Sequence, residues 1–206
     1  MYSGYFVGLT SLFIACLIAA NIIAVKIVGL GGVFLPAGIV VFPLSYIIGD
    51  VMTEIFGFQK AKFAILLGFV ANFIVVLAIA AAQALPAAPF WDLQLSFDAI
   101  LGVAPRILVA SFSGYLGGSL LNAWSMHKIK ELTKGRFLWL RTISSTVLGE
   151  GVDTILFLGI AFGGLLASAQ IVTMVLTQWV VKVVYEVVAT PLTYFVITKL
   201  KKAGVQ

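Results

Sequence analysis

The chain has 206 residues, of which 62% are hydrophobic and only 10% are charged, and its formal net charge is +5. A folded protein of this size leaves much of its surface exposed, so a chain this apolar needs a lipid bilayer as its solvent. The composition therefore excludes a soluble enzyme, a nucleic-acid-binding module and a disordered chain. One cysteine and one histidine exclude an internal disulfide and a His-rich metal site, so we expect no metal and no other cofactor.

Six stretches are apolar and long enough to cross a bilayer, which takes about 20 residues. In chain order they are residues 5–26, 36–56, 61–85, 100–124, 138–167 and 171–200. They are separated by short connections, of which the longer two are a linker with Asp92 and Asp98 and a polar, basic stretch at 126–136. The sequence predicts an all-α integral membrane protein in which residues 1–206 form a single domain of six transmembrane helices.

The placement of basic residues predicts the orientation. Lys and Arg gather in the second and fourth linkers and near the C-terminus, whereas the third linker has none; the basic residues are Lys60, Lys62, Lys128, Lys130, Lys134, Arg136, Arg141, Lys199, Lys201 and Lys202. With six spans, the basic linkers and both termini fall on one side of the membrane. Because cytoplasmic loops carry the excess of Lys and Arg, we expect both termini in the cytoplasm.

Eight charged residues fall inside the predicted spans, and these are Lys26, Asp50, Glu54, Arg106, Glu150, Asp153, Lys182 and Glu186. An ion at mid-bilayer costs about 2.5–3.5 kcal/mol on insertion scales, so these groups are expected to face inward, to pair or to meet water. Lys26 and Arg106 lie nearer the outer face and are candidates for a gate or a structural pair. For each residue, a structural ion pair or a solvated interfacial position remains the alternative.

Helical spacing places several of these groups on common faces. Tyr46, Asp50 and Glu54 recur every four residues, with Pro43 one turn earlier, where it is expected to free a backbone carbonyl. Lys182 shares a face with Gln178 and Glu186, and Pro191 is expected to kink that helix. Together with Asn21, Glu150 and Asp153, these residues predict a polar centre built from several spans. Two alternatives stay open: Glu54 as an interfacial carboxylate, and Lys182 paired with Glu186 inside one helix.

The chemistry of this centre favours binding. Carboxylates accept paired N–H groups, as in the recognition of nucleobase edges, and the excess of two negative charges implies either protons held at rest or a cationic ligand. An intramembrane enzyme is disfavoured because the spans hold no His or Cys pair, although a carboxylate dyad of Asp50 and Asp153 stays open. A channel is the other competitor. Small residues at Gly114 and Gly118 predict close helix packing.

The second predicted span carries the most specific motif of the chain. Phe42-Pro43-Leu44-Ser45-Tyr46, followed by Gly49-Asp50 and Thr53-Glu54 before Gly57, resembles the signature of the queuosine-precursor transporter family, also called the vitamin uptake transporter family. Segments of four other spans resemble the same family, and they include Asn21 with Lys26, Arg106 with Ala110-Ser111, Arg141-Thr142 with Asp153, and Lys182, Glu186 and Thr190-Pro191.

The resemblance implies a bacterial or archaeal inner-membrane importer, similar in architecture to the substrate-binding subunits of energy-coupling-factor transporters. The implied cargo is a 7-deazaguanine: preQ0, preQ1 or queuine. The implied surroundings are the lipid bilayer, and no nucleic acid is expected as a partner. The oligomeric state stays open, with a homo-oligomer as one option. Glu150 departs from the family pattern, where a neutral residue is usual. The candidate binding residues are Asn21, Tyr46, Asp50, Glu54, Glu150, Asp153, Lys182 and Glu186. A subunit that needs an ATP-driven partner is the alternative function.

Overall fold

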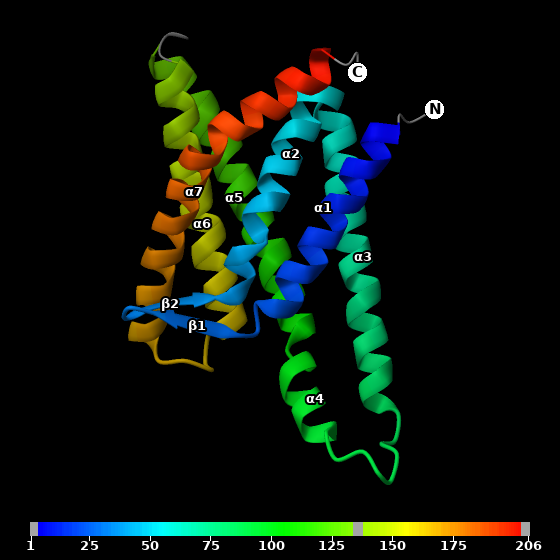
Figure 1. Ribbon diagram of the computed structural model, residues 1–206. Helices are drawn as coiled ribbons and strands as arrows, with labels where there is room; N and C mark the ends of the chain where they lie inside the picture. The colour runs from blue at the N-terminus through cyan, green and yellow to red at the C-terminus, as the bar shows by residue number, and fades with distance from the viewer. Residues whose placement is uncertain (1–3, 134–137, 203–206) are drawn as a thin grey trace. The chain divides into compact units, whose positions relative to one another are not determined.

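The computed structural model describes residues 4–133 and 138–202, and these residues are mostly helical (Figure 1). The elements are α1 (Gly4–Ile23), β1 (Ile27–Leu30), β2 (Val33–Pro36), a 3-10 helix (Ala37–Val40), α2 (Phe42–Phe56), α3 (Phe58–Ala84), α4 (Gln94–Leu101), α5 (Ala104–Leu132), α6 (Leu138–Phe162) and α7 (Ser168–Lys202). The chain divides into two compact units. The first comprises Met1–Val28, Pro36–Leu108 and Tyr185–Gln206, and the second comprises Gly29–Leu35 and Val109–Val184.

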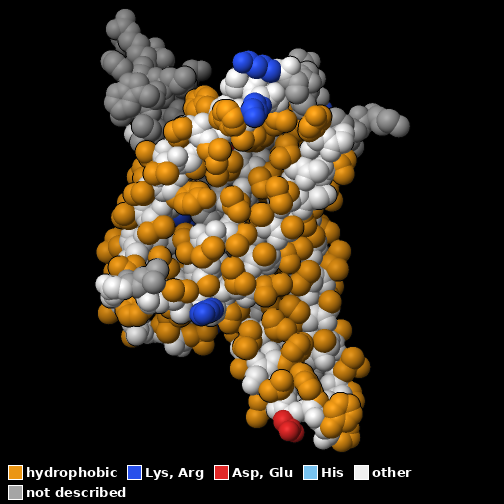
Figure 2. Space-filling model, viewed as in Figure 1, with side chains coloured by type: hydrophobic (Ala, Val, Ile, Leu, Met, Phe, Trp, Pro, Cys, Tyr) orange, Lys and Arg blue, Asp and Glu red, His pale blue; other side chains and the backbone are white. Residues whose placement is uncertain are grey.

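The surface of the molecule is that of a membrane protein. Hydrophobic side chains cover most of the face seen in Figure 2. Along α3, large apolar side chains are exposed at a helical spacing that suits contact with lipid, among them Leu66, Val70, Ile74 and Leu77. Because a water-soluble protein rarely exposes so wide an apolar surface, the structure agrees with the predicted all-α membrane protein.

Four segments of the described residues are long and apolar enough to cross a bilayer, and these are Gly4–Ile23, Gln59–Ala84, Gln94–Asn122 and Ser168–Lys202. α2 has 15 residues, and at 1.5 Å per residue it is about 22 Å long, shorter than the ~30 Å hydrocarbon layer. α6 has 25 residues and includes two carboxylates, Glu150 and Asp153. The structure therefore identifies a multi-pass helical protein, and the count of six crossings stays a prediction.

The core of the first unit lies where α1, α2 and α3 pack side by side (Figure 1). Its buried side chains come from all three helices: Phe6, Phe13, Cys16, Leu17, Ile48, Met52, Phe56, Ala61 and Ala64. The rings of Phe6 and Phe56 meet edge to face with centroids 5.2 Å apart. Gly68 lets α3 approach α1 closely, because a Cβ there would lie 2.9 Å from Leu17 Cδ2. This packing fixes the helix that carries Asp50 and Glu54.

A β-hairpin follows α1, where the sequence predicts only the end of the first span and a short connection to the second. α1 ends at Ile23, so Lys26 lies beyond the helix and not inside a span to residue 26. β1 and β2 pair across Gly31 and Gly32, whose φ values of 56° and 87° fall in the left-handed region that glycine adopts readily. A Gly-Gly pair between two apolar runs is typical of a β-hairpin turn, and the hairpin could have been predicted from this pair.

The second predicted span is shorter than expected because its first residues are not α-helical. Residues 36–40 end β2 and form a 3-10 helix, and α2 begins at Phe42 with Pro43 in its first turn. The missing N–H of a proline costs nothing there, because the first turn of a helix has no intrahelical acceptor. The prediction that Pro43 removes a helix hydrogen bond and so frees a backbone carbonyl is therefore wrong.

Three other boundaries differ from the predicted ones. Asp98 lies in α4 and not in a linker, and its carboxylate accepts hydrogen bonds from Gln83 and Gln94 at 3.0 Å. α5 continues to Leu132, past residue 124, so much of the stretch read as a basic linker is helical. α6 ends at Phe162, and Gly164, with a φ of 76°, lies in the connection to α7. The apolar residues of the sequence identify the spans. They do not show where a helix ends once its polar residues extend beyond the membrane, so the predicted boundaries differ from those of the structure.

The second unit is held together by close contact between α5 and α6. A Cβ at Gly114 would lie 2.8 Å from the backbone oxygen of Asp153, and one at Gly118 would lie 2.8 Å from that of Gly149. Side chains at either glycine would force the helices apart. The prediction that the Gly114–Gly118 pair packs helices is confirmed.

Candidate functional site

An ion cluster lies in the second unit, where α7 meets α6. Lys182 Nζ pairs with Glu150 Oε2 at 3.1 Å and with Asp153 Oδ2. The side chain of Lys182 is only 4% exposed, and those of Glu150 and Asp153 are 14% and 10% exposed. The structure thus brings together three of the predicted binding residues, from two helices, away from solvent.

Local sequence explains how the three groups meet. Glu150 and Asp153 are three residues apart on α6, so they project from one side of the helix. Gly151 between them lets the Trp179 ring of α7 approach, because a Cβ at Gly151 would lie 3.3 Å from Trp179 Cε2. The Trp179 indole N–H donates a hydrogen bond to the Val147 carbonyl at 2.9 Å, which ties α7 to α6. The helix pair therefore presents Lys182 to both carboxylates.

The cluster carries an uneven charge. Two carboxylates and one ammonium give a formal net charge of −1 in surroundings with little water. Ions buried this way are stabilised only by close partners and by further hydrogen bonds. Such a site favours a ligand that brings a positive charge or several N–H donors.

Neutral polar groups are buried in the same unit. The Gln178 side chain is buried one turn before Lys182, and its Oε1 has no hydrogen-bond partner among the described residues. Thr154, next to Asp153, is fully buried, and within the described chain its Oγ1 also lacks a partner. Sequence reasoning placed Gln178 on the face of Lys182 but did not select it as a binding residue, and it missed Thr154 because a single threonine in an apolar helix gives no signal.

Asn21 belongs to the first unit and has a structural partner. Its Nδ2 donates a hydrogen bond to Asn72 Oδ1 at 3.0 Å, and Asn72 Nδ2 donates to the Gly68 carbonyl at 3.1 Å. Both side chains are buried between α1 and α3. Hydrogen bonds between side-chain amides of neighbouring helices stabilise membrane bundles. The sequence does not single out Asn72, because neutral polar residues are common in such helices.

The second-span motif lies on α2 in the first unit. Glu54 is 53% exposed and pairs with Lys201 Nζ of α7 at 2.5 Å, which agrees with the interfacial alternative for this carboxylate. Asp50, one turn earlier, is exposed. The Tyr46 side chain lies outside what the structure describes. The binding roles of these three residues stay predictions.

The remaining candidates also belong to the first unit. Glu186 is half-buried on α7, one turn after Lys182, but falls within the segment Tyr185–Gln206. Arg106 is half-buried in the first turn of α5, and Lys26 is exposed between α1 and β1. Lys182 has its described ion pairs with α6, so a pair within α7 is not needed to explain its burial.

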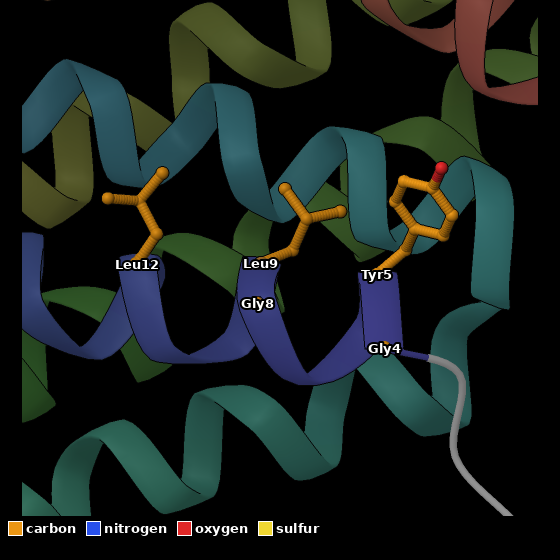
Figure 3. Close-up of a pocket in the computed structure, with 5 residues that line it drawn as sticks. All are labelled: Gly4, Tyr5, Gly8, Leu9 and Leu12. Carbon is orange, nitrogen blue, oxygen red and sulfur yellow. The ribbon is translucent and has the colours of Figure 1, made fainter.

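A groove of about 530 Å³ runs along α1 and is lined by Gly4, Tyr5, Gly8, Leu9 and Leu12 (Figure 3). Tyr5, Leu9 and Leu12 point to the same side of the helix in Figure 3. Its lining carries no charged group, so its chemistry differs from that of the ion cluster.

Comparison with known proteins identifies the family of this chain. The profile of the family described as "Putative vitamin uptake transporter" matches residues 36–196. The chain is thus a membrane transporter and not an enzyme, and it belongs to the vitamin uptake transporter family.

One relative shows the same likeness over most of its length. The protein named "Probable queuosine precursor transporter" from Bacillus subtilis (strain 168) is 24% identical to this chain over 178 residues, which cover 86% of this chain and 78% of that protein. No solved structure matches the chain. The family predicted from the second-span motif is confirmed.

Proposed function

We propose that this chain imports queuosine precursors, 7-deazaguanines such as preQ0, preQ1 or queuine, across the inner (plasma) membrane of a bacterium for the queuosine modification of tRNA. The printed name of the Bacillus subtilis relative supports this substrate class. The observation that carries the proposal is the buried Glu150–Asp153–Lys182 cluster, because its carboxylates suit the N–H donors of a guanine-like edge.

The residues proposed to bind substrate divide by unit. In the second unit, Glu150 and Asp153 accept N–H groups of the ligand, and Lys182 sets the local charge or reaches a carbonyl oxygen. In the first unit, Asn21, Tyr46, Asp50, Glu54 and Glu186 are the proposed contacts. Lys26 and Arg106 are proposed for an outer gate or a structural pair.

The proposed architecture is the one that the sequence predicts. Residues 1–206 form a single domain of six transmembrane helices with both termini in the cytoplasm, similar to the substrate-binding subunits of energy-coupling-factor transporters. The distribution of Lys and Arg supports this orientation. The bilayer surrounds the domain, and a homo-oligomer is compatible with it.

Complementation tests the proposal. Cells that can neither make nor import a queuosine precursor receive this chain alone, and queuosine in their tRNA is measured after addition of preQ0 or preQ1. We expect queuosine to appear with the wild-type chain and to fall strongly with Asp153→Asn. No queuosine unless an ATP-driven module is co-expressed would favour the energy-coupling-factor alternative, and none in either case would contradict the proposal.

A further inference from the structure

Four neutral oxygens in the described part of the chain are buried without a hydrogen-bond partner, and they belong to Asn122, Ser125, Thr154 and Gln178. All four lie in the second unit, which also holds the ion cluster. Buried polar atoms in folded proteins nearly always bond to protein, water or ligand. Unpaired polar atoms in the unit that also holds the ion cluster therefore mark a place where a polar ligand finds hydrogen-bond partners.

Gln178 and Thr154 are the two of these residues nearest to the cluster along their helices. Gln178 precedes Lys182 by four residues and so shares its face of α7, and Thr154 follows Glu150 by four residues on α6. The packing of the Trp179 ring on Gly151 holds these parts of α6 and α7 at the same position along the two helix axes. Side chains tilt toward the N-terminus of their helix, which carries the Lys182 ammonium toward the level of Gln178.

We propose that Gln178 and Thr154 are specificity-determining residues that bind the neutral edge of the substrate, while Glu150 and Asp153 hold its N–H-rich or cationic part. This inference rests on the proposed function and deepens it. A primary amide offers an acceptor and donors side by side, so Gln178 forms two parallel hydrogen bonds with a ring lactam, where a carbonyl adjoins an N–H. The Thr154 hydroxyl supplies a third bond. The selected substrate class is a planar heterocycle with a lactam edge.

A binding role and a structural role predict opposite effects of substitution. An unpaired buried acceptor destabilises the ligand-free protein, so replacing Gln178 by Met, of similar volume and without the amide, leaves the melting temperature unchanged or raises it. The same change removes hydrogen bonds made only with ligand, so affinity falls. If the amide instead supported the fold, the melting temperature would drop and affinity would stay.

The experiment measures direct binding to the purified full chain and melting of the ligand-free chain, for wild type, Gln178→Met and Thr154→Val. The probes are preQ0, preQ1 and guanine, which carry the lactam, and 2-aminopurine, which lacks its carbonyl. Thr173→Val is the matched control, because Thr173 is exposed on α7 and its hydroxyl donates to the Ala169 carbonyl. This control should bind every probe as the wild type does.

We expect Gln178→Met to weaken the binding of preQ0 and preQ1 by about tenfold or more and that of 2-aminopurine by less than about twofold, without a lower melting temperature. Thr154→Val should weaken preQ0 and preQ1 by about threefold or more. Wild-type binding of these precursors that neither variant weakens, or an equal loss for 2-aminopurine, would overturn this inference alone. A wild-type chain that binds none of the lactam probes would overturn the proposed function and this inference together.

Discussion

Lys182 is the residue on which the ion cluster depends. Replacing it by Met leaves Glu150 and Asp153 buried without their shared cation, so we expect the free energy of unfolding to fall by about 3–5 kcal/mol. Unfolding of the purified chain in detergent, followed by circular dichroism, measures the change. Lys128→Met is the control: its pair with Glu131 is more than half exposed, so it should change stability by less than about 1 kcal/mol.

A combined variant separates lost charge balance from lost packing. Lys182→Met together with Glu150→Gln and Asp153→Asn has no ion to bury, so it should recover most of the stability lost by the single variant. If the combined variant is as unstable as Lys182→Met alone, the charge explanation for the cluster is wrong.

Glu150 tests the preference of the site for a cation. Its carboxylate makes the cluster negative by one charge, so Glu150→Gln should weaken preQ1, which carries an aminomethyl cation, more than neutral preQ0. Competition for binding between the two compounds measures the ratio. An equal loss for both would show that Glu150 does not distinguish the charge of the ligand.

At the residue scale, charge was predictable and neutral polarity was not. Glu150, Asp153 and Lys182 stand out from an apolar background, and the cost of an isolated ion predicts that they pair. Their actual partnership across α6 and α7 needed the structure, because spacing alone also allowed Lys182 to pair with Glu186. Asn72, Thr154 and Gln178 are neutral, and only their burial distinguishes them from ordinary polar residues of membrane helices, together with the hydrogen bonds of Asn72 and the unpaired oxygens of Thr154 and Gln178.

At the scale of the helices, the close contact between α5 and α6 keeps Asp153 of the ion cluster in place. A Cβ at Gly114 would lie 2.8 Å from Asp153 Oδ1, so Gly114→Ala should displace Asp153 and reduce both stability and substrate uptake. Gly159→Ala is the matched control on α6, because a Cβ there meets no atom within 4 Å. Uptake of labelled preQ1 and melting temperature check both variants, and equal results for the two would contradict the packing role.

Helices were predictable as elements, whereas their ends were not. The apolar runs gave six helical stretches, and the spacing of Gly114 and Gly118 correctly predicted close packing. Pro43 was misread because a proline is equally compatible with a kink and with a helix start, and only the 3-10 helix before it decides between them. The hairpin was missed because its apolar strands continue the hydropathy of the neighbouring spans.

At the scale of the whole molecule, the orientation is open to direct test. In a Cys16→Ala background, single cysteines replace Asp92, Lys60 and Lys130 and are exposed to a membrane-impermeant thiol reagent in intact cells. Six crossings with cytoplasmic termini predict labelling at position 92 and protection at positions 60 and 130. Labelling of 60 or 130 would contradict the proposed topology, and Cys16→Ala without added cysteine controls for background.

The most direct test of the account is calorimetric binding of preQ0, preQ1, queuine and guanine to the purified chain. The control variant is Lys128→Gln, which breaks the exposed pair with Glu131 and leaves the buried cluster intact. We expect the wild type and Lys128→Gln to bind at least one 7-deazaguanine, and Asp153→Asn to lose about tenfold or more in affinity, the loss of a charge-assisted hydrogen bond. Absence of binding, or equal affinity in Asp153→Asn, would contradict the claim that this cluster binds a queuosine precursor.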